Sequence, residues 1–215
     1  MSGDSRIKLM SEGNISKSLF KFGIPMIAAM LVNALYNVID AYFVSGLGTS
    51  AMAAVFVAFP ISLIFSGVGL TFGSGGGSYI SRLLGAGNKN EASKVASTAL
   101  FSCIFISIII AILFLIFLSD ILVFMGATET ILPYAKSYAF IFIIASIVSA
   151  FNVSMGNLAV SQGASVISLV SIFTGAILNV ILCPVFIYAL NLGVKGSAIA
   201  TLMAQSVTAL IYICT

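Results

Sequence analysis

Six long apolar runs dominate this sequence and decide what it can fold into. A helix needs about 20 predominantly apolar residues to cross the hydrocarbon core of a bilayer. Barrel strands that cross a membrane instead give segments of about ten residues with alternating hydrophobicity. The sequence therefore predicts an all-α membrane protein with six transmembrane helices. These helices are expected at about 18–44, 51–73, 96–118, 134–156, 166–189 and 194–215.

The composition also indicates a chain that lies in a lipid bilayer. Apolar residues make up 60% of the sequence and charged residues only 7%, which is too few to cover the surface of a soluble domain. The net charge is +3, but the basic residues do not gather on one predicted helix, so no nucleic-acid partner is expected. There is no His, and the three Cys have no paired spacing, so neither an enzyme nor a cofactor or zinc site is predicted.

The distribution of Lys and Arg predicts the orientation. Residues 1–17 are polar and lack the apolar core and cleavage site of a secretory signal, so we expect a cytoplasmic N-terminal tail followed by one lobe over 18–215. Cytoplasmic loops of membrane proteins carry an excess of basic residues. With the N-terminus inside, only Lys136 and Lys195 fall outside, and the sequence predicts a multi-pass plasma-membrane protein. The basic residues then on the cytoplasmic side are Arg6, Lys8, Lys17, Lys21, Arg82, Lys89 and Lys94.

A glycine-rich segment at residues 73–78 is not a phosphate-binding loop. No Gly-Lys-Ser/Thr sequence follows it, and no strand precedes it. Small residues in membrane helices allow neighbouring backbones to approach closely. We therefore expect close helix packing or a bend at this place.

Asp40 is the only acidic residue well inside a predicted span. Asn37, Tyr36 and Asn33 precede it by three, four and seven residues, so all four share one helical face. An ionisable residue at the centre of a membrane helix costs about 2.5–3.5 kcal/mol, which makes it a candidate functional group. The alternative is that Asp40 lies near the interface and caps a helix end.

Polar stripes also follow the fifth and sixth runs. At 1.5 Å per residue, Asp40, Cys183 and Thr201 are expected at depths within about 5 Å of one another. Three helices are thus predicted to bring polar groups together in the outer half of the membrane. The stripes consist of Ser168, Ser171, Gly175, Asn179 and Cys183, followed by Pro184, in the fifth run, and of Thr201, Gln205 and Thr208 in the sixth.

Such a cluster suits a small cation. A carboxyl group removed from water can exchange a proton, and amide and hydroxyl oxygens suit a hard cation, so H⁺ and Na⁺ both remain open. Interhelical hydrogen bonding is the alternative role for the amides and hydroxyls. The predicted cation-binding residues are Asp40, Asn37, Asn179 and Thr201, with Na⁺ at Asp40 as the one metal considered. The predicted cavity or accessory residues are Asn33, Tyr36, Cys183, Gln205 and, as a bending point, Pro25.

Four separate parts of the chain resemble the multidrug and toxic compound extrusion (MATE) family. They are Pro25 with 37–48 (NVIDAYFVSGLG), 81–87 (SRLLGAG), 175–179 (GAILN) with Pro184, and 193–201 (GVKGSAIAT). The resemblance implies a twelve-helix antiporter of two six-helix lobes that exports organic cations and amphipathic compounds against H⁺ or Na⁺. This chain would be the N-terminal lobe, and Asp40 the carboxylate of its cation site, with Asn179 and Thr201 as companions. The second lobe would follow in the same polypeptide or come from a dimer partner.

The chain departs from the family pattern in two places. The family commonly has an acidic residue just before the fifth-helix proline, where this chain has Cys183, so Asp40 is the sole acid of the predicted site. The neutral thiol of Cys183 does not replace a carboxylate as a cation ligand. The family also often carries an Arg near the end of the fourth helix, where residues 157–163 of this chain read NLAVSQG.

Two other functions remain open from the sequence. A flippase of related fold that moves lipid-linked sugars would need Arg or Lys in its cavity to bind pyrophosphate. The predicted spans contain essentially none beyond Lys21 and Lys136, which lie near span ends. A non-transporting membrane subunit or remnant is the second alternative.

For the export function, the expected partners are small drugs or organic cations, the lipid bilayer and a second six-helix lobe.

Overall fold

The computed structural model describes residues 15–214, and every regular element in this range is a helix. The predicted tail at 1–17 lies outside the described residues, except for its last three, which begin the first helix. The elements are α2 (Ile15–Ser45), α3 (Thr49–Gly85), α4 (Lys89–Ile116), α5 (Leu118–Phe124), α6 (Leu132–Ser161), α7 (Ser165–Pro184), the π-helix η1 (Val185–Ala189) and α8 (Val194–Cys214). Six of them are long and apolar enough to cross a membrane, which confirms the predicted fold class.

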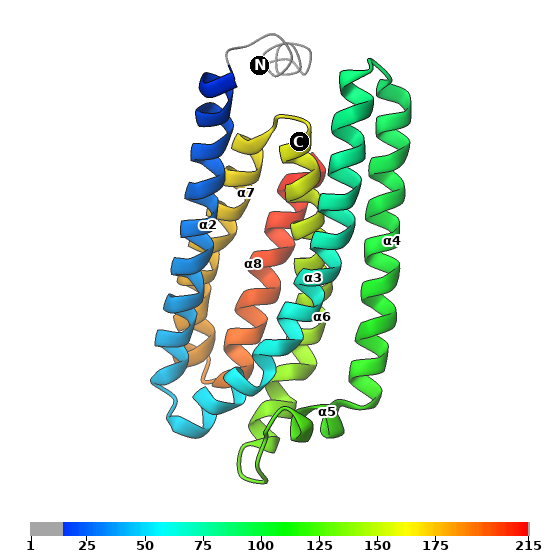
Figure 1. The fold of residues 1–215 in the computed structure, drawn as a ribbon. Coiled ribbons are helices and arrows are strands. Elements are labelled where there is room, and N and C mark those ends of the chain that lie inside the picture. The colour runs from blue at the N-terminus through cyan, green and yellow to red at the C-terminus, as the bar shows by residue number, and fades with distance from the viewer. Residues whose placement is uncertain (1–14, 215) are drawn as a thin grey trace.

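The long helices alternate in direction, so α2 begins and α8 ends at the same end of the bundle (Figure 1). We call this the N-terminal end. In Figure 1, α2 and α4 form opposite edges, and α6 and α8 lie between them. The most extensive packing joins α3 to α6, α6 to α8, and α2 to α7. Asp40 on α2 therefore lies toward the end opposite the N-terminus, where α7 ends and α8 begins.

Helix α3 continues to Gly85, well beyond the predicted end at residue 73, and residues 73–78 are helical within it. The glycines on its buried face allow α6 to approach closely. A Cβ added at Gly69 would lie 2.6 Å from the carbonyl oxygen of Ala150, and one at Gly73 would lie 2.8 Å from the Cα of Ser154. Of the two roles considered for this segment, the structure shows the close helix packing.

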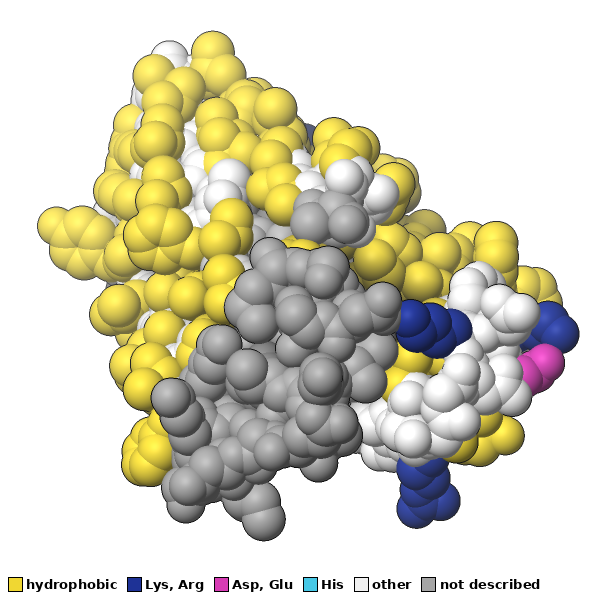
Figure 2. Space-filling model, turned by 90° about the horizontal axis from the view of Figure 1, so that it is seen from above, with side chains coloured by type: hydrophobic (Ala, Val, Ile, Leu, Met, Phe, Trp, Pro, Cys, Tyr) yellow, Lys and Arg dark blue, Asp and Glu magenta, His cyan; other side chains and the backbone are white. Residues whose placement is uncertain are grey.

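The surface matches a protein that lies in a bilayer. Large apolar side chains point outward along the helices; on α4, for example, Phe101 is 74% exposed and Phe105 is 64% exposed. The view from the N-terminal end shows hydrophobic side chains over the flanks and several separate Lys and Arg side chains at the end itself (Figure 2). At this end the turn between α3 and α4 is flanked by Arg82, Lys89 and Lys94.

Candidate functional site

Asp40 joins three helices. It lies five residues before the end of α2, and its Oδ1 accepts hydrogen bonds from Ser197 Oγ on α8 at 3.0 Å and from Cys183 Sγ on α7 at 3.3 Å. Cys183 and Ser197 are fully buried. The carboxyl group is thus held by side chains of two neighbouring helices, and it does not cap the end of α2.

A second set of side chains repeats this arrangement one helical turn away. Thr201 Oγ1 lies 3.2 Å from Tyr36 Oη and accepts a hydrogen bond from Asn179 Nδ2 at 3.3 Å. Each of these residues is four positions from its counterpart in the first set on the same helix. Four residues correspond to about 6 Å along a helix axis. We call the two sets the Asp40 layer (Asp40, Cys183, Ser197) and the Tyr36 layer (Tyr36, Asn179, Thr201).

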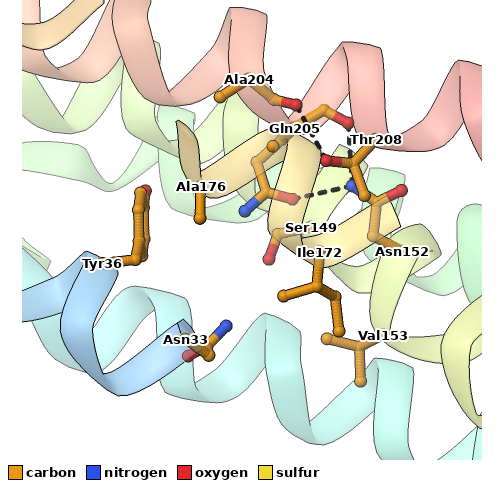
Figure 3. A pocket seen from close by; sticks show the side chains of 11 residues that line it. Asn33, Tyr36, Ser149, Asn152, Val153, Ile172, Ala176, Ala204, Gln205 and Thr208 are labelled. Carbon is orange, nitrogen blue, oxygen red and sulfur yellow. Dashed lines mark hydrogen bonds between the residues drawn. The ribbon is translucent and has the colours of Figure 1, made fainter. Parts of the chain in front are cut away.

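A third polar level follows in the same direction and surrounds a small cavity of about 100 Å³ (Figure 3). Asn152 Nδ2 on α6 donates to Gln205 Oε1 at 2.7 Å and to the Gln205 carbonyl oxygen at 2.8 Å. The Gln205 amide nitrogen faces the space between Tyr36, Asn33 and Ser149 in Figure 3. On α7 this level holds Gly175, where an added Cβ would collide with the Thr208 hydroxyl.

A larger cavity of about 510 Å³ opens beside these layers, between α2, α3, α6 and α8. Asp40 is the one charged residue that lines it in the described part of the chain. Its polar wall comes from α2, α8 and hydroxyls of α3 and α6, and its apolar wall from α3 and α6. The apolar wall includes Val55, Phe56, Phe59, Leu63 and Phe142. This combination suits an amphipathic molecule with a positive charge.

The oxygens of the two layers suit a small hard cation. Asn179 is fully buried, and its Oδ1 has no hydrogen-bond partner among the described residues. Together with the carboxylate of Asp40 and the hydroxyl of Thr201, this amide oxygen is the kind of ligand that hard cations prefer. No cluster of three or more His, Cys, Asp or Glu occurs in residues 15–214, so these oxygens do not form a typical transition-metal site.

The other predicted residues differ in whether they contact Asp40, line a cavity or do neither. Asn37 lines the larger cavity but donates to the backbone oxygen of Asn33 at 2.8 Å and to Asn33 Oδ1 at 3.2 Å, and Asp40 receives no bond from it. Cys183 contacts Asp40 directly, whereas Asn33, Tyr36 and Gln205 line both cavities. Pro25 lies within α2, 15 residues or about 22 Å from Asp40, and lines neither cavity.

Sequence reasoning missed three residues that the structure brings to this region. Ser197 bonds Asp40, Asn152 bonds Gln205, and the buried Tyr138 of α6 lines the larger cavity. Ser197 lies one turn before Thr201 on the same face, so its position in the stripe was readable. Asn152 was readable as an amide inside an apolar run.

Most of the chain matches a known protein family. The MatE family model matches residues 25–185. This chain belongs to the MatE family. The Multidrug export protein MepA of Staphylococcus haemolyticus is 31% identical over 212 residues, which are 98% of this chain and 47% of that protein. The MepA of Staphylococcus saprophyticus is 29% identical over the same shares. The chain thus spans about half the length of these curated relatives.

Solved MATE structures have the same fold as this chain. The crystal structure of a MATE point mutant superposes with a TM-score of 0.90 at 31% identity, over 96% of this chain and 46% of that one. A MOP superfamily transporter from Pyrococcus furiosus is described as having a binding pocket of reverse polarity. It superposes with a TM-score of 0.87 at 31% identity, over 99% of this chain and 46% of that one. The six helices correspond to about half of a MATE structure, as expected for one lobe. MATE proteins are transporters and not enzymes, in agreement with the sequence prediction.

Proposed function

We propose that this MatE chain is one lobe of a secondary active multidrug exporter, which exchanges organic cations or amphipathic compounds for H⁺ or Na⁺. The observation that carries the proposal is Asp40 as the one charged lining residue of a cavity of about 510 Å³ with aromatic and aliphatic walls. A lone carboxylate in apolar surroundings attracts either a cationic substrate or a coupling ion. Competition between the two for one site would couple their opposite movements.

The coupling site comprises the Asp40 and Tyr36 layers. Asp40 carries the exchangeable charge, while Asn179 Oδ1 and Thr201 Oγ1 supply neutral oxygens one turn away. Asn37, on the cavity side of α2, would contact an entering ion or substrate rather than orient Asp40. Asn33, Tyr36 and Gln205 belong to the polar wall of the larger cavity, against which a substrate binds. Pro25 would serve as a bending point of α2, away from the ion site.

The larger cavity needs a second lobe to become a closed transport pathway. The chain covers 47% of the length of its MepA relatives, so the partner is a further six-helix lobe, either in the same polypeptide or in a dimer. The basic residues flanking the α3–α4 turn support an N-terminus on the cytoplasmic side of the plasma membrane. In that orientation Asp40 lies in the outer half of the bilayer.

The flippase alternative gains no support from the cavity. A pyrophosphate-bearing lipid needs Arg or Lys for recognition, and the lining contains neither type among the described residues. A non-transporting subunit would not need a charged residue in a cavity of this size. The transport function therefore fits the arrangement best.

Transport of a fluorescent organic cation by membrane vesicles that contain the complete gene product tests the proposal. An imposed H⁺ or Na⁺ gradient is expected to drive accumulation well above that of vesicles without the protein. A fluorescent organic anion of similar size serves as the control and is expected to give no accumulation, because the cavity offers only a negative charge. If neither gradient drives cation transport, the non-transporting alternative is favoured.

Replacement of Cys183 by Asp is expected to increase the dependence of transport on Na⁺. The Cys183 sulfur lies 3.3 Å from Asp40 Oδ1, so the new carboxylate would share a site with Asp40. Cation affinity rises with the number of charged oxygen ligands, and we expect the half-saturating Na⁺ concentration to fall about tenfold. Cys183→Ser is the matched control, because it keeps a small neutral donor. An equal Na⁺ dependence in both variants would contradict the expectation that a carboxylate at position 183 binds Na⁺ together with Asp40.

A further inference from the structure

The last turn of α2, directly after Asp40, has a hydrogen-bond partner for each of its four terminal carbonyl groups. A helix end leaves four backbone C=O groups without intrahelical partners. Tyr42 O accepts from Ser45 Oγ at 2.7 Å, Val44 O from Leu47 N at 3.0 Å, and Ser45 O from Gly48 N at 3.2 Å. These three partners are local.

The fourth partner comes from a distant part of the chain. Phe43 O accepts a hydrogen bond from Tyr188 Oη at 2.6 Å. Tyr188 belongs to the π-helix η1, which directly follows Cys183 and Pro184. Without this partner, the Phe43 carbonyl would be one of the unsatisfied groups at the helix end. The Tyr188 hydroxyl thus connects the end of α2 to the helix that also contacts Asp40.

The π-helix explains how Tyr188 reaches this side of the bundle. Its hydrogen bonds span five residues, as between Leu190 N and Val185 O at 3.0 Å, so the turn is wider than an α-helical turn. In a regular α-helix, five residues rotate the chain by about 500°, which would turn Tyr188 about 140° away from Cys183. The wider turn brings both residues toward α2. Pro184, which lacks a backbone N–H, lies where the regular helix ends.

Gly46 makes room for the Tyr188 hydroxyl. A Cβ on Gly46 would collide with Tyr188 Oη. A second glycine, Gly196, lets α8 pack on η1, because its added Cβ would lie 2.6 Å from Phe186 O. The π-helix therefore packs closely on the beginning of α8 and reaches the end of α2 through the Tyr188 side chain. These are the two helices that carry Asp40 and its donor Ser197.

We propose that Tyr188, Gly46 and the Phe43 carbonyl form a latch that positions Asp40 between Cys183 and Ser197. The latch attaches α2 to the α7–η1 segment three residues, or about 4.5 Å along the axis, beyond Asp40. With the Asp40–Cys183 bond it makes a two-point attachment, which fixes the rotation of α2 as well as its distance. Tyr188 is thus a positioning residue, because it lines neither cavity. Its role in coupling rests on the proposed transport function, but its effect on geometry does not.

The effect of the latch on the position of α2 is tested by alkylation of Cys183 in the complete gene product. Mass spectrometry then measures the modification of the peptides that carry Cys183 and Cys103. Both thiols are fully buried, and Cys103 lies away from the latch on α4. In Tyr188→Phe and in Gly46→Ala we expect N-ethylmaleimide to modify Cys183 about fivefold faster, the factor that corresponds to one lost hydrogen bond. Cys103 is expected to react as in the unchanged protein.

Ser45→Ala is the matched control, because it removes a carbonyl cap of the same helix end that does not reach η1. It is expected to leave Cys183 protected. Unchanged labelling of Cys183 in Tyr188→Phe, an equal rise in Ser45→Ala, or a parallel rise at Cys103 would each overturn the latch. A second readout is the ion-concentration dependence of transport, which Tyr188→Phe is expected to shift and Ser45→Ala is not. If the unchanged protein does not transport, the labelling result still decides the latch.

Discussion

Replacement of Asp40 by Asn is expected to reduce ion-driven transport by one to two orders of magnitude while leaving membrane insertion unchanged. Asn has the size of Asp, and its Oδ1 can still accept from Ser197 and Cys183. What the variant loses is the charge and the exchangeable proton. Coupling free energies between two binding events commonly correspond to about 5–150-fold changes. The measurement is gradient-driven accumulation of a fluorescent organic cation in vesicles.

The matched control is Asp120→Asn. Asp120 lies exposed on the short helix α5 and lines neither cavity, so its neutralisation tests the loss of one negative charge outside the site. We expect it to transport as the unchanged protein does. Equal transport by Asp40→Asn and the unchanged protein would show that Asp40 is only structural, and would move the coupling site to the second lobe.

The number and type of the helices could be predicted because the bilayer imposes a length on each apolar run. The end of α3 could not, because hydropathy falls at residues 73–78 although the helix continues to Gly85. Gly and Ser there are poor in apolar surface, but they allow α6 to contact the helix backbone closely. A property that depends on two helices is invisible in the hydropathy of one.

In the candidate site, too, the sequence predicts the face of each helix but not the contacts between helices. The i, i+4 spacing of Tyr36 and Asp40, of Asn179 and Cys183, and of Thr201 and its neighbours predicted faces that the structure brings together. Tyr188 was not predictable in this way, since the π-helix changes the face on which it lies. The same periodicity predicts Asn37 on the face of Asp40, where its amide nitrogen donates to Asn33 and makes no bond to Asp40. Periodicity selects a face and does not select a hydrogen-bond partner.

Replacement of Gly69 by Ala is expected to destabilise the lobe by about 1–3 kcal/mol, the usual cost of an extra methyl group in a tightly packed interface. The added Cβ would lie 2.6 Å from the Ala150 carbonyl oxygen and 2.9 Å from the Val153 Cβ. The α3–α6 contact is the most extensive in the bundle, so the two helices must separate along their length. Thermal unfolding in detergent, followed by size-exclusion chromatography, measures the loss.

Gly67→Ala is the control, because its added Cβ would have no atom within 4 Å apart from the adjoining backbone of its own helix. It should be neutral or stabilising by about 0.5–1 kcal/mol, since Ala favours a helix over Gly. The two variants make the same chemical change two residues apart, but only Gly69→Ala should lower the free energy of unfolding. Adding Val153→Ala to Gly69→Ala should restore little, because the nearest atom is a backbone oxygen that no substitution removes. Full restoration would show that the Val153 side chain, and not the approach of the two backbones, determines how closely α3 packs on α6.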